Sequence, residues 1–286
     1  MINKLIRSIA KKILSILAIK GGREVWIKSI INRDFNYQLL RKPGQRMINI
    51  GAGSQFCDKN FVALDFNPIF TKYTATEFPF GKKVHFDLMD RSTRMPFNNL
   101  DIVYSSHSFE HLPVCDVLRI LLQVHANMKD GAILRIVVPD ADLILDALKR
   151  NDLDFFAFYR PYFGGIVPSI IDYVFLFLHT GAGRVIHGTL NKNFREETYA
   201  EFEKLKNENN INIINWFNSI KTESDAKGTF HQSAHNFNSL SELLRQSGFR
   251  NIYRSAFMQS RETILREVPK FDGTHPWMSL YIEAFK

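Results

Sequence analysis

Cysteine is scarce in this sequence, which has only two among its 286 residues, Cys57 and Cys115. Two isolated cysteines provide neither a disulfide framework nor a closely spaced pair of metal ligands, so we expect a reducing compartment and no metal site. No apolar run approaches the roughly 18–20 residues that a membrane-spanning helix needs, and no cleavable signal peptide is evident. These absences predict a cytoplasmic protein without a transmembrane segment.

What the sequence does contain is ample material for a folded core, because 45% of its residues are hydrophobic and 23% are charged. Its net charge of +8 is unevenly distributed. Residues 1–42 hold ten basic and two acidic side chains, whereas residues 43–286 hold 27 of each sign. The main domain has no net charge, so its charge gives no support to a nucleic-acid partner. The excess positive charge belongs to the N-terminal segment.

The first 42 residues are predicted to form a basic, helical N-terminal extension. Within residues 1–20, isoleucines and leucines fall on one face of a helical wheel, and lysines, Arg7 and serines fall on the opposite face. Such a helix can lie on an anionic membrane surface, which would place the protein at the inner face of the membrane. It can equally pack its apolar face on the main domain, and both interpretations stay open.

Residues 43–286 show the alternation of strands and helices that is typical of an α/β domain. Two late strands follow one another without a crossover helix and should therefore be antiparallel. Asp130-Gly131 is expected to end the helix before the fifth strand. The expected strands are 47–50, 61–65, 84–87, 101–105, 133–138, 251–257 and 279–285, with helices over 114–128 and 239–246.

An insertion over residues 151–230 interrupts this pattern and is rich in aromatic residues in its first part. One interpretation is a set of helices that pack their own aromatic side chains. The other is a lid over an apolar or lipid-linked acceptor, because a solvent-facing loop does not need so many aromatic residues.

Four strand ends carry the polar residues from which a ligand site can be built. Met47–Ile50 runs directly into Gly51-Ala52-Gly53, a turn that lets the backbone approach a ligand closely. The next strand ends in Asp65, which can accept hydrogen bonds from ribose hydroxyls. A third strand ends in Asp87, and a fourth runs into the polar segment 105–111. Open α/β sheets bind ligands at this edge.

In order, the segments INIGAGS, FVALDFNP, VHFDL, LDIVYSSHSFEHL and MKDGAILRIVVPD resemble those of class I S-adenosylmethionine-dependent methyltransferases. More narrowly, the chain is similar to the small-molecule branch that is associated with bacterial surface glycans. The resemblance covers residues 46–140 and 230–286. It implies a doubly wound, mostly parallel seven-stranded sheet with an antiparallel last strand, and S-adenosyl-L-methionine as the cofactor.

The resemblance also assigns roles to individual residues. Gly51, Ala52 and Gly53 would approach the methionyl part of the cofactor. Asp65 would bind the ribose hydroxyls with Phe66 beside the adenine, and Asp87 and Leu88 would contact the adenine as well. Ser105, Ser106 and His107 would border the sulfonium and the acceptor.

Transfer of a methyl group to a hydroxyl requires a base, and an imidazole can take a proton at neutral pH. The candidates are His107, Glu110 and His111, with His187 and His235 as further ones. Alternatively, Glu110 and His111 only orient or cap the helix that follows Pro113.

The predicted function is methyl transfer to oxygen or nitrogen of a small acceptor that is saccharide-related or lipid-linked. A protein that keeps the fold and the cofactor site without catalysis is the main alternative. A nucleic-acid methyltransferase is less favoured, since no Asn-Pro-Pro-Tyr or Pro-Cys motif is present. A Rossmann dehydrogenase is also less favoured, because the third glycine of its fingerprint is missing.

Overall fold

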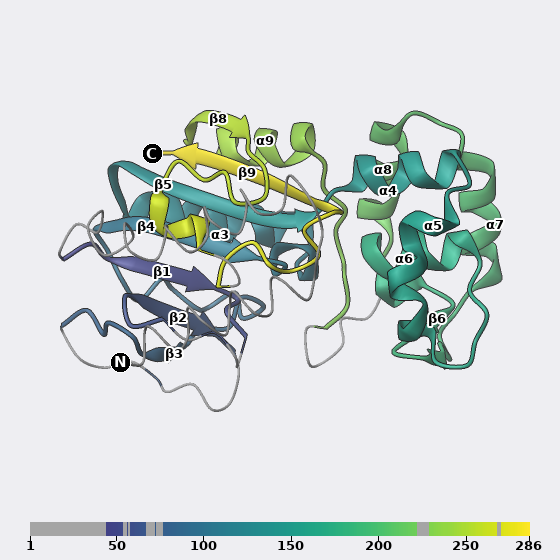
Figure 1. Cartoon of the computed structure of the whole chain (residues 1–286), viewed down its shortest axis with the longest axis horizontal. Coiled ribbons are helices and arrows are strands. Elements are labelled where there is room, and N and C mark those ends of the chain that lie inside the picture. Colours follow the sequence, from purple (N-terminus) through teal and green to yellow (C-terminus); the bar gives the residue numbers. More distant parts are fainter. Residues whose placement is uncertain are drawn as a thin grey trace, which may run out of the picture. The chain divides into compact units, whose positions relative to one another are not determined.

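Seven strands form one mixed sheet in the order β3-β2-β1-β4-β5-β9-β8 (Figure 1). The computed structural model describes residues 44–53, 56, 58–66, 72, 77–221, 229–267 and 270–286, so the predicted extension 1–42 lies outside the described residues. Neighbouring strands from β3 to β5 run parallel, and β9 runs antiparallel to both β5 and β8. The predicted mostly parallel sheet of seven strands with an antiparallel last strand is confirmed.

The strands that the sequence located best are the most apolar ones. Strands β1, β2 and β9 begin and end where predicted, and all but one of their residues are buried. Strand β3 starts one residue earlier and ends two residues earlier than expected, and β8 starts one residue earlier and ends three residues earlier, at Arg254. The observed strands are β1 (Met47–Ile50), β2 (Phe61–Asp65), β3 (Lys83–His85), β4 (Leu100–Ser106), β5 (Met128–Pro139), β8 (Arg250–Arg254) and β9 (Ser279–Phe285).

The prediction that Gly131 ends the helix before the fifth strand is wrong. The helix ends at Asn127, and the next backbone N–H, that of Met128, donates to Val124 and His125. Met128 already pairs with Leu100 in the sheet, so β5 begins at the residue that directly follows the helix. Gly131 has a positive φ of 76° within β5, at the point where the pairing of β5 with β4 is irregular.

Helices belong to two groups, one beside the sheet and one in the insertion. In Figure 1 the insertion helices gather beyond the carboxyl end of β5. None of the helices in the described part of the chain is both long and apolar enough to cross a bilayer. The helices are α3 (Val114–Asn127), α4 (Ala141–Lys149), α5 (Leu153–Phe156), α6 (Ile170–Leu178), α7 (Glu196–Leu205), α8 (Asn210–Ser219) and α9 (Phe237–Gln246), with the short 3-10 helix η1 (Phe109–His111).

Two hydrophobic cores correspond to these groups. The first lies between the sheet and helices α3 and α9. The second is formed by α4, α6, α7 and α8 and is rich in aromatic rings. Most of the early insertion aromatics are buried in the second core, whereas Phe158 and Tyr162 are exposed. The insertion therefore packs the larger part of its aromatic surface on itself.

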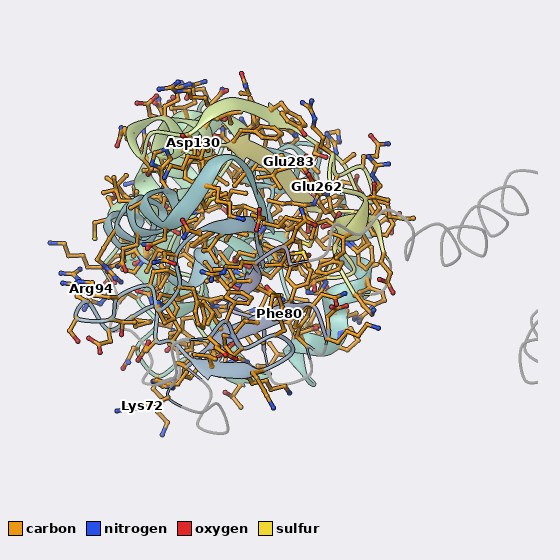
Figure 2. The ribbon with its side chains drawn as sticks, turned by 90° about the vertical axis from the view of Figure 1, so that its left-hand side faces the viewer. Lys72, Phe80, Arg94, Asp130, Glu262 and Glu283 are labelled. Atoms are coloured by element: carbon orange, nitrogen blue, oxygen red, sulfur yellow. The ribbon has the colours of Figure 1, made fainter. Side chains whose placement is uncertain are left out.

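A buried group of charges crosses β5 and β9. The guanidinium of Arg135 is fully buried and donates to Asp272 and to Glu283 Oε1, the latter at 2.8 Å. In Figure 2 Glu283 lies among the packed side chains, whereas Lys72 and Arg94 lie at the outline of the molecule. Buried charges are tolerated when they are paired in this way, and the pairing fixes the segment around Asp272 against the sheet.

Candidate functional site

A pocket of about 260 Å³ lies at the carboxyl edge of the parallel strands. Its walls come from the segments that follow β1, β2, β3 and β4. The order of the strands reverses between β1 and β4, and open α/β sheets bind ligands at such a switch point. The lining residues are Gly51, Gly53, Asp65, Phe66, Phe86, Asp87, Leu88, Met89, His107, Ser108, His111, Leu112 and Thr229.

The turn after β1 requires glycine for two different reasons. Gly51 and Gly53 both have positive φ angles, 65° and 64°, which side chains disfavour. A Cβ atom at Gly51 would also lie 2.0 Å from the Oγ atom of Ser108, whereas a Cβ at Gly53 would meet no atom of the described residues within 4 Å. Gly51 therefore makes room for Ser108, and Gly53 leaves open space at the pocket.

Two carboxylates stand on the pocket wall. Asp65 ends β2, is largely buried, and accepts a hydrogen bond from the Gly53 backbone N–H at 2.7 Å. This bond ties the glycine turn to the end of the neighbouring strand. Asp87 follows β3 and accepts from the Met89 backbone N–H at 2.9 Å. The half-exposed Phe66 and the buried Phe86 add apolar surface to the same wall.

Three residues of the predicted cofactor set do not line this pocket. Ala52 donates its backbone N–H to the Leu64 carbonyl, and Ser105 donates its hydroxyl to the Ile50 carbonyl at 3.0 Å. Ser106 pairs with Val137 where β4 meets β5. These residues hold neighbouring strand ends together beneath the pocket. Gly51, Gly53, Asp65, Phe66, Asp87 and Leu88, by contrast, all lie on its wall.

The three predicted catalytic residues lie together, but only two of them reach the pocket. His107 and His111 line it, whereas Glu110 is buried behind them with 1% of its surface exposed. His107 Nδ1 lies 3.0 Å from Glu110 Oε1, and His107 Nε2 lies 2.9 Å from Ser279 Oγ. Glu110 therefore orients the His107 ring from behind.

The charge state of this pair follows from its surroundings. Burial acts to raise the pKa of the Glu110 carboxyl, but the adjacent His107 ring outweighs burial and, with His111 and His231, lowers that pKa to about 2. Glu110 is therefore an ionised carboxylate at neutral pH. Such a carboxylate favours the tautomer of His107 that carries its proton on Nδ1, which leaves Nε2 as the basic atom.

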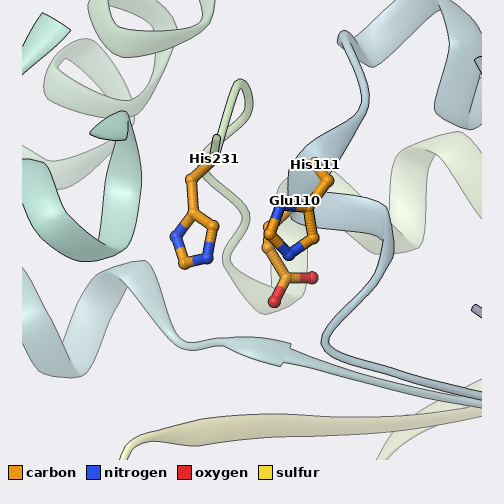
Figure 3. A group of neighbouring side chains, drawn as sticks. All are labelled: Glu110, His111 and His231. Carbon is orange, nitrogen blue, oxygen red and sulfur yellow. The ribbon is translucent and has the colours of Figure 1, made fainter. Parts of the chain in front are cut away.

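His231, which the sequence did not single out, joins this group from the segment before α9 (Figure 3). Its ring lies 4.8 Å from that of His111, and its Nδ1 atom lies 2.7 Å from the Phe177 carbonyl oxygen. Burial, together with His111, lowers the pKa of His231 to about 3, so the ring is neutral at pH 7.

The two further histidine candidates lie outside the pocket wall. His235 is buried and its Nε2 atom lies 2.8 Å from the hydroxyl of Ser233. Burial lowers the pKa of His235 to about 4, and its backbone pairs with that of Asp140, directly after β5. His187 is exposed in the insertion, with Nε2 3.5 Å from Thr229 Oγ1.

Sequence reasoning missed several site residues, among them Ser108, His231 and His275. Ser108 lies inside the quoted motif, and the adjoining hydroxyls of Ser105 and Ser106 were the only signal for it. His231 and His275 come from distant segments. The His275 ring lies 5.3 Å from that of His107, and burial, together with His107, lowers its pKa to about 4.

No known protein family matches the sequence, and no curated protein does. Among solved structures, the chain is similar to an S-adenosylmethionine-dependent methyltransferase from Mesorhizobium loti, with 14% identity, a TM-score of 0.39, and coverage of 88% of this chain and 96% of that one. A second similar structure is an S-adenosylmethionine-dependent methyltransferase from Archaeoglobus fulgidus, with 17% identity, a TM-score of 0.38, and coverage of 93% and 95%. Similarities at this level establish no function, so the function has to be inferred from the strand order and the pocket of this chain.

Proposed function

We propose that the chain is an S-adenosylmethionine-dependent methyltransferase that acts on oxygen or nitrogen of a small acceptor. The observation that carries this proposal is the arrangement of the Gly51–Gly53 turn, Asp65 and Asp87 around one pocket at the switch point of the sheet. Each of these groups follows a different parallel strand. Their convergence suits a nucleoside ligand, with carboxylates for its hydroxyl and amino groups and apolar wall for its base.

The residues present fit such a cofactor. Asp65 accepts the Gly53 backbone N–H, which fixes its carboxylate beside the turn and supports its assignment to the ribose hydroxyls. Phe66, Phe86 and Leu88 offer apolar surface for the adenine, and Asp87 stands beside them. When bound, S-adenosylmethionine would supply an electrophilic methyl group. The chain's own residues then have to orient the acceptor and, for a hydroxyl acceptor, remove its proton.

His107 is the residue we assign to proton removal. It lines the pocket, and the buried Glu110 carboxylate at 3.0 Å stabilises the protonated ring that forms when a proton is taken up. Ser279 Oγ lies 2.9 Å from Nε2, and an acceptor hydroxyl would have to take its place to transfer a proton to this nitrogen. Glu110 is a positioning residue in this account, and His111 borders the same wall.

A saccharide-related or lipid-linked acceptor is supported by an aromatic platform formed by Phe158, Tyr159, Tyr162, His275 and Trp277. His275 connects His107 to Tyr159, whose ring lies 5.1 Å away, and Trp277 packs against Phe158 at 5.0 Å. Three members are exposed to a degree that is unusual for large aromatics: Phe158 at 66%, Tyr162 at 51% and Trp277 at 46%. Exposed rings contiguous with a catalytic base offer surface for sugar faces or lipid chains.

The first test is calorimetric titration of the full chain with S-adenosylhomocysteine. We expect one binding site, and we expect Asp65→Asn to weaken binding about 10- to 100-fold because a charge-assisted hydrogen bond is lost. The exposed Asp130→Asn variant is the matched control and should bind normally. Absence of binding would overturn the cofactor assignment.

The acceptor is tested separately, by transfer of a labelled methyl group to sugar nucleotides and to lipid-linked saccharides. Transfer to either class supports the saccharide assignment, and a preference for the lipid-linked compounds supports the lipid part of it. Cofactor binding without transfer to any acceptor would instead favour a non-catalytic binding protein.

A further inference from the structure

Three side chains that can bind metal converge next to the pocket. Glu110 and His111 come from η1 directly after β4, and His231 comes from the segment that precedes α9. One ligand atom of each lies within 4.8 Å of the others. Figure 3 shows the His231 ring facing the Glu110 carboxylate, with the His111 ring above that carboxylate.

The Nδ1 atoms of His111 and His231 already have hydrogen-bond partners. His231 Nδ1 lies 2.7 Å from the Phe177 carbonyl oxygen, and His111 Nδ1 lies 3.3 Å from the Phe230 carbonyl oxygen. A carbonyl oxygen only accepts, so both Nδ1 atoms carry a proton and both Nε2 atoms keep a free electron pair. This is the arrangement in which metal-binding histidines are commonly held, with the second nitrogen hydrogen-bonded to a backbone carbonyl.

Glu110 supplies an independent reason to expect a cation. Its carboxylate is almost completely buried, and Oε1 lies 3.0 Å from His107 Nδ1. Oε2 is buried and has no hydrogen-bond partner in the described part of the chain. An unsatisfied carboxylate oxygen in the interior is costly, and a bound cation would remove that cost.

The dimensions also fit. Three atoms no more than 4.8 Å apart lie within 4.8/√3, or about 2.8 Å, of a common point, and Zn²⁺ binds nitrogen at about 2.0–2.1 Å. Side-chain shifts of less than about 1 Å would therefore complete the coordination. Two imidazoles and one carboxylate favour Zn²⁺, Fe²⁺ or Co²⁺ over Mg²⁺ and Ca²⁺, which prefer oxygen ligands.

We propose that Glu110 Oε2, His111 Nε2 and His231 Nε2 form a binding site for a divalent transition-metal ion. Three protein ligands leave at least one coordination position open, as in catalytic metal sites. His111 also lines the pocket, so the ion would border it. There it would bind an oxygen atom of the acceptor, a role that rests on the proposed function, whereas the metal site itself does not.

The test is calorimetric titration of the untagged, chelator-treated full chain with Zn²⁺ in the absence of cofactor and acceptor. We expect one equivalent of Zn²⁺ to bind and to raise the melting temperature, with much weaker binding of Mg²⁺. Glu110→Gln and His231→Gln should each weaken Zn²⁺ binding by about 100-fold or more. His125→Gln, on α3 against Phe249, is the matched control and should bind Zn²⁺ like the unaltered chain.

Co²⁺ provides a second readout, because its visible absorption reports the coordination of the ion directly. We expect absorption bands with the unaltered chain and with His125→Gln, and their loss with His231→Gln. Failure of the unaltered chain to bind Zn²⁺ or Co²⁺ would overturn the proposal even where a variant does not fold. Unchanged Zn²⁺ affinity in both ligand variants would overturn it as well. Neither result affects the titration with S-adenosylhomocysteine, so the metal site and the proposed methyltransferase function can fail independently of each other.

Discussion

At the scale of single residues, Ser108 explains why the turn after β1 begins with glycine. Its hydroxyl lies within hydrogen-bond distance of the carbonyl oxygens of Gly51 and Ser106, at 3.1 and 3.2 Å. Ser108 thereby connects the turn after β1 to the segment after β4, and it occupies the space that a Gly51 side chain would need. The first glycine serves packing between two loops, and only the second faces open space.

The pair Gly51 and Gly53 allows these effects to be separated by substitution. We expect Gly51→Ala to lower the free energy of unfolding by about 2–4 kcal/mol, because backbone strain adds to a clash with Ser108. Gly53→Ala has the same backbone strain without the clash and should lose only about 1 kcal/mol. Urea unfolding measures both losses.

A double variant identifies the source of the difference. Ser108→Gly removes both atoms that crowd position 51 and should restore part of the stability of Gly51→Ala. Equal losses in Gly51→Ala and Gly53→Ala, or no restoration in the double variant, would show that Ser108 is not the cause.

At the scale of elements, Asp172 connects α6 to two other parts of the insertion. It accepts the Ser169 backbone N–H at the start of α6, the Arg184 guanidinium at 2.6 Å, and the Tyr199 hydroxyl of α7 at 3.0 Å. Burial acts to raise the pKa of Asp172, but the hydrogen bonds from Arg184 and Ser169 outweigh burial and lower the pKa below its ordinary value of 3.8. The ionised carboxylate therefore stabilises the insertion.

This lowered pKa predicts a pH-dependent effect of Asp172→Asn. At pH 7 the substitution should lower the free energy of unfolding by about 2 kcal/mol. The loss is no larger because the Arg184 side chain is partly exposed, and solvent screens its charge. The unfolded chain binds a proton at Asp172 near pH 3.8, where the folded chain does not, so the contribution of Asp172 is lost as the pH falls further. The difference between the two proteins should therefore shrink below about pH 4.

Urea unfolding at pH 7 and at successively lower pH values measures this difference. The exposed Asp154→Asn variant in α5 serves as the control and should show no pH-dependent difference from the unaltered chain. A cost of Asp172→Asn that is constant between pH 7 and pH 3 would contradict the assignment.

The bounds of the strands and helices show which parts of the fold could be predicted from the sequence. Strands β1, β2 and β9 were located to the residue, because an uninterrupted apolar run bounded by polar turns has few other structures. The start of β5 was placed five residues too late, at 133 instead of 128, because Asp130-Gly131 is an ordinary helix-stop signal and the pairing of Met128 with Leu100 is a tertiary contact. The pocket residues that follow strand ends were predictable for the same reason as the strands.

Contacts between distant segments were beyond the reach of these patterns. Glu110 and His111 are adjacent in sequence, but nothing local indicates that His231 joins them. The absence of paired cysteines predicted that the chain has no metal site, an expectation that considered only ligands close together in the sequence. The proposed site instead depends on how the segment before α9 crosses η1 (Figure 3).

At the scale of the whole molecule, the distribution of charge separates two functions. Residues 43–286, which contain the pocket, hold equal numbers of acidic and basic side chains, and the net charge of +8 belongs to residues 1–42. With no net charge, the part of the chain that contains the pocket offers no overall attraction to a highly charged partner. The basic segment is therefore expected to act on its own, and an anionic membrane surface suits its amphipathic pattern.

This expectation can be tested without truncating the chain. Replacing Lys4, Arg7 and Lys11 by Gln removes three positive charges, each worth about 1 kcal/mol at an anionic membrane surface, so vesicle affinity should fall by about 100-fold. Sedimentation with phosphatidylserine-containing vesicles measures this affinity, with phosphatidylcholine vesicles as the neutral control. Binding of S-adenosylhomocysteine should be unaffected, because the pocket residues lie between Gly51 and Thr229. If the substituted chain still sedimented like the unaltered one, the N-terminal charge would not be a membrane anchor, and an acidic protein or packing on the domain would have to account for it.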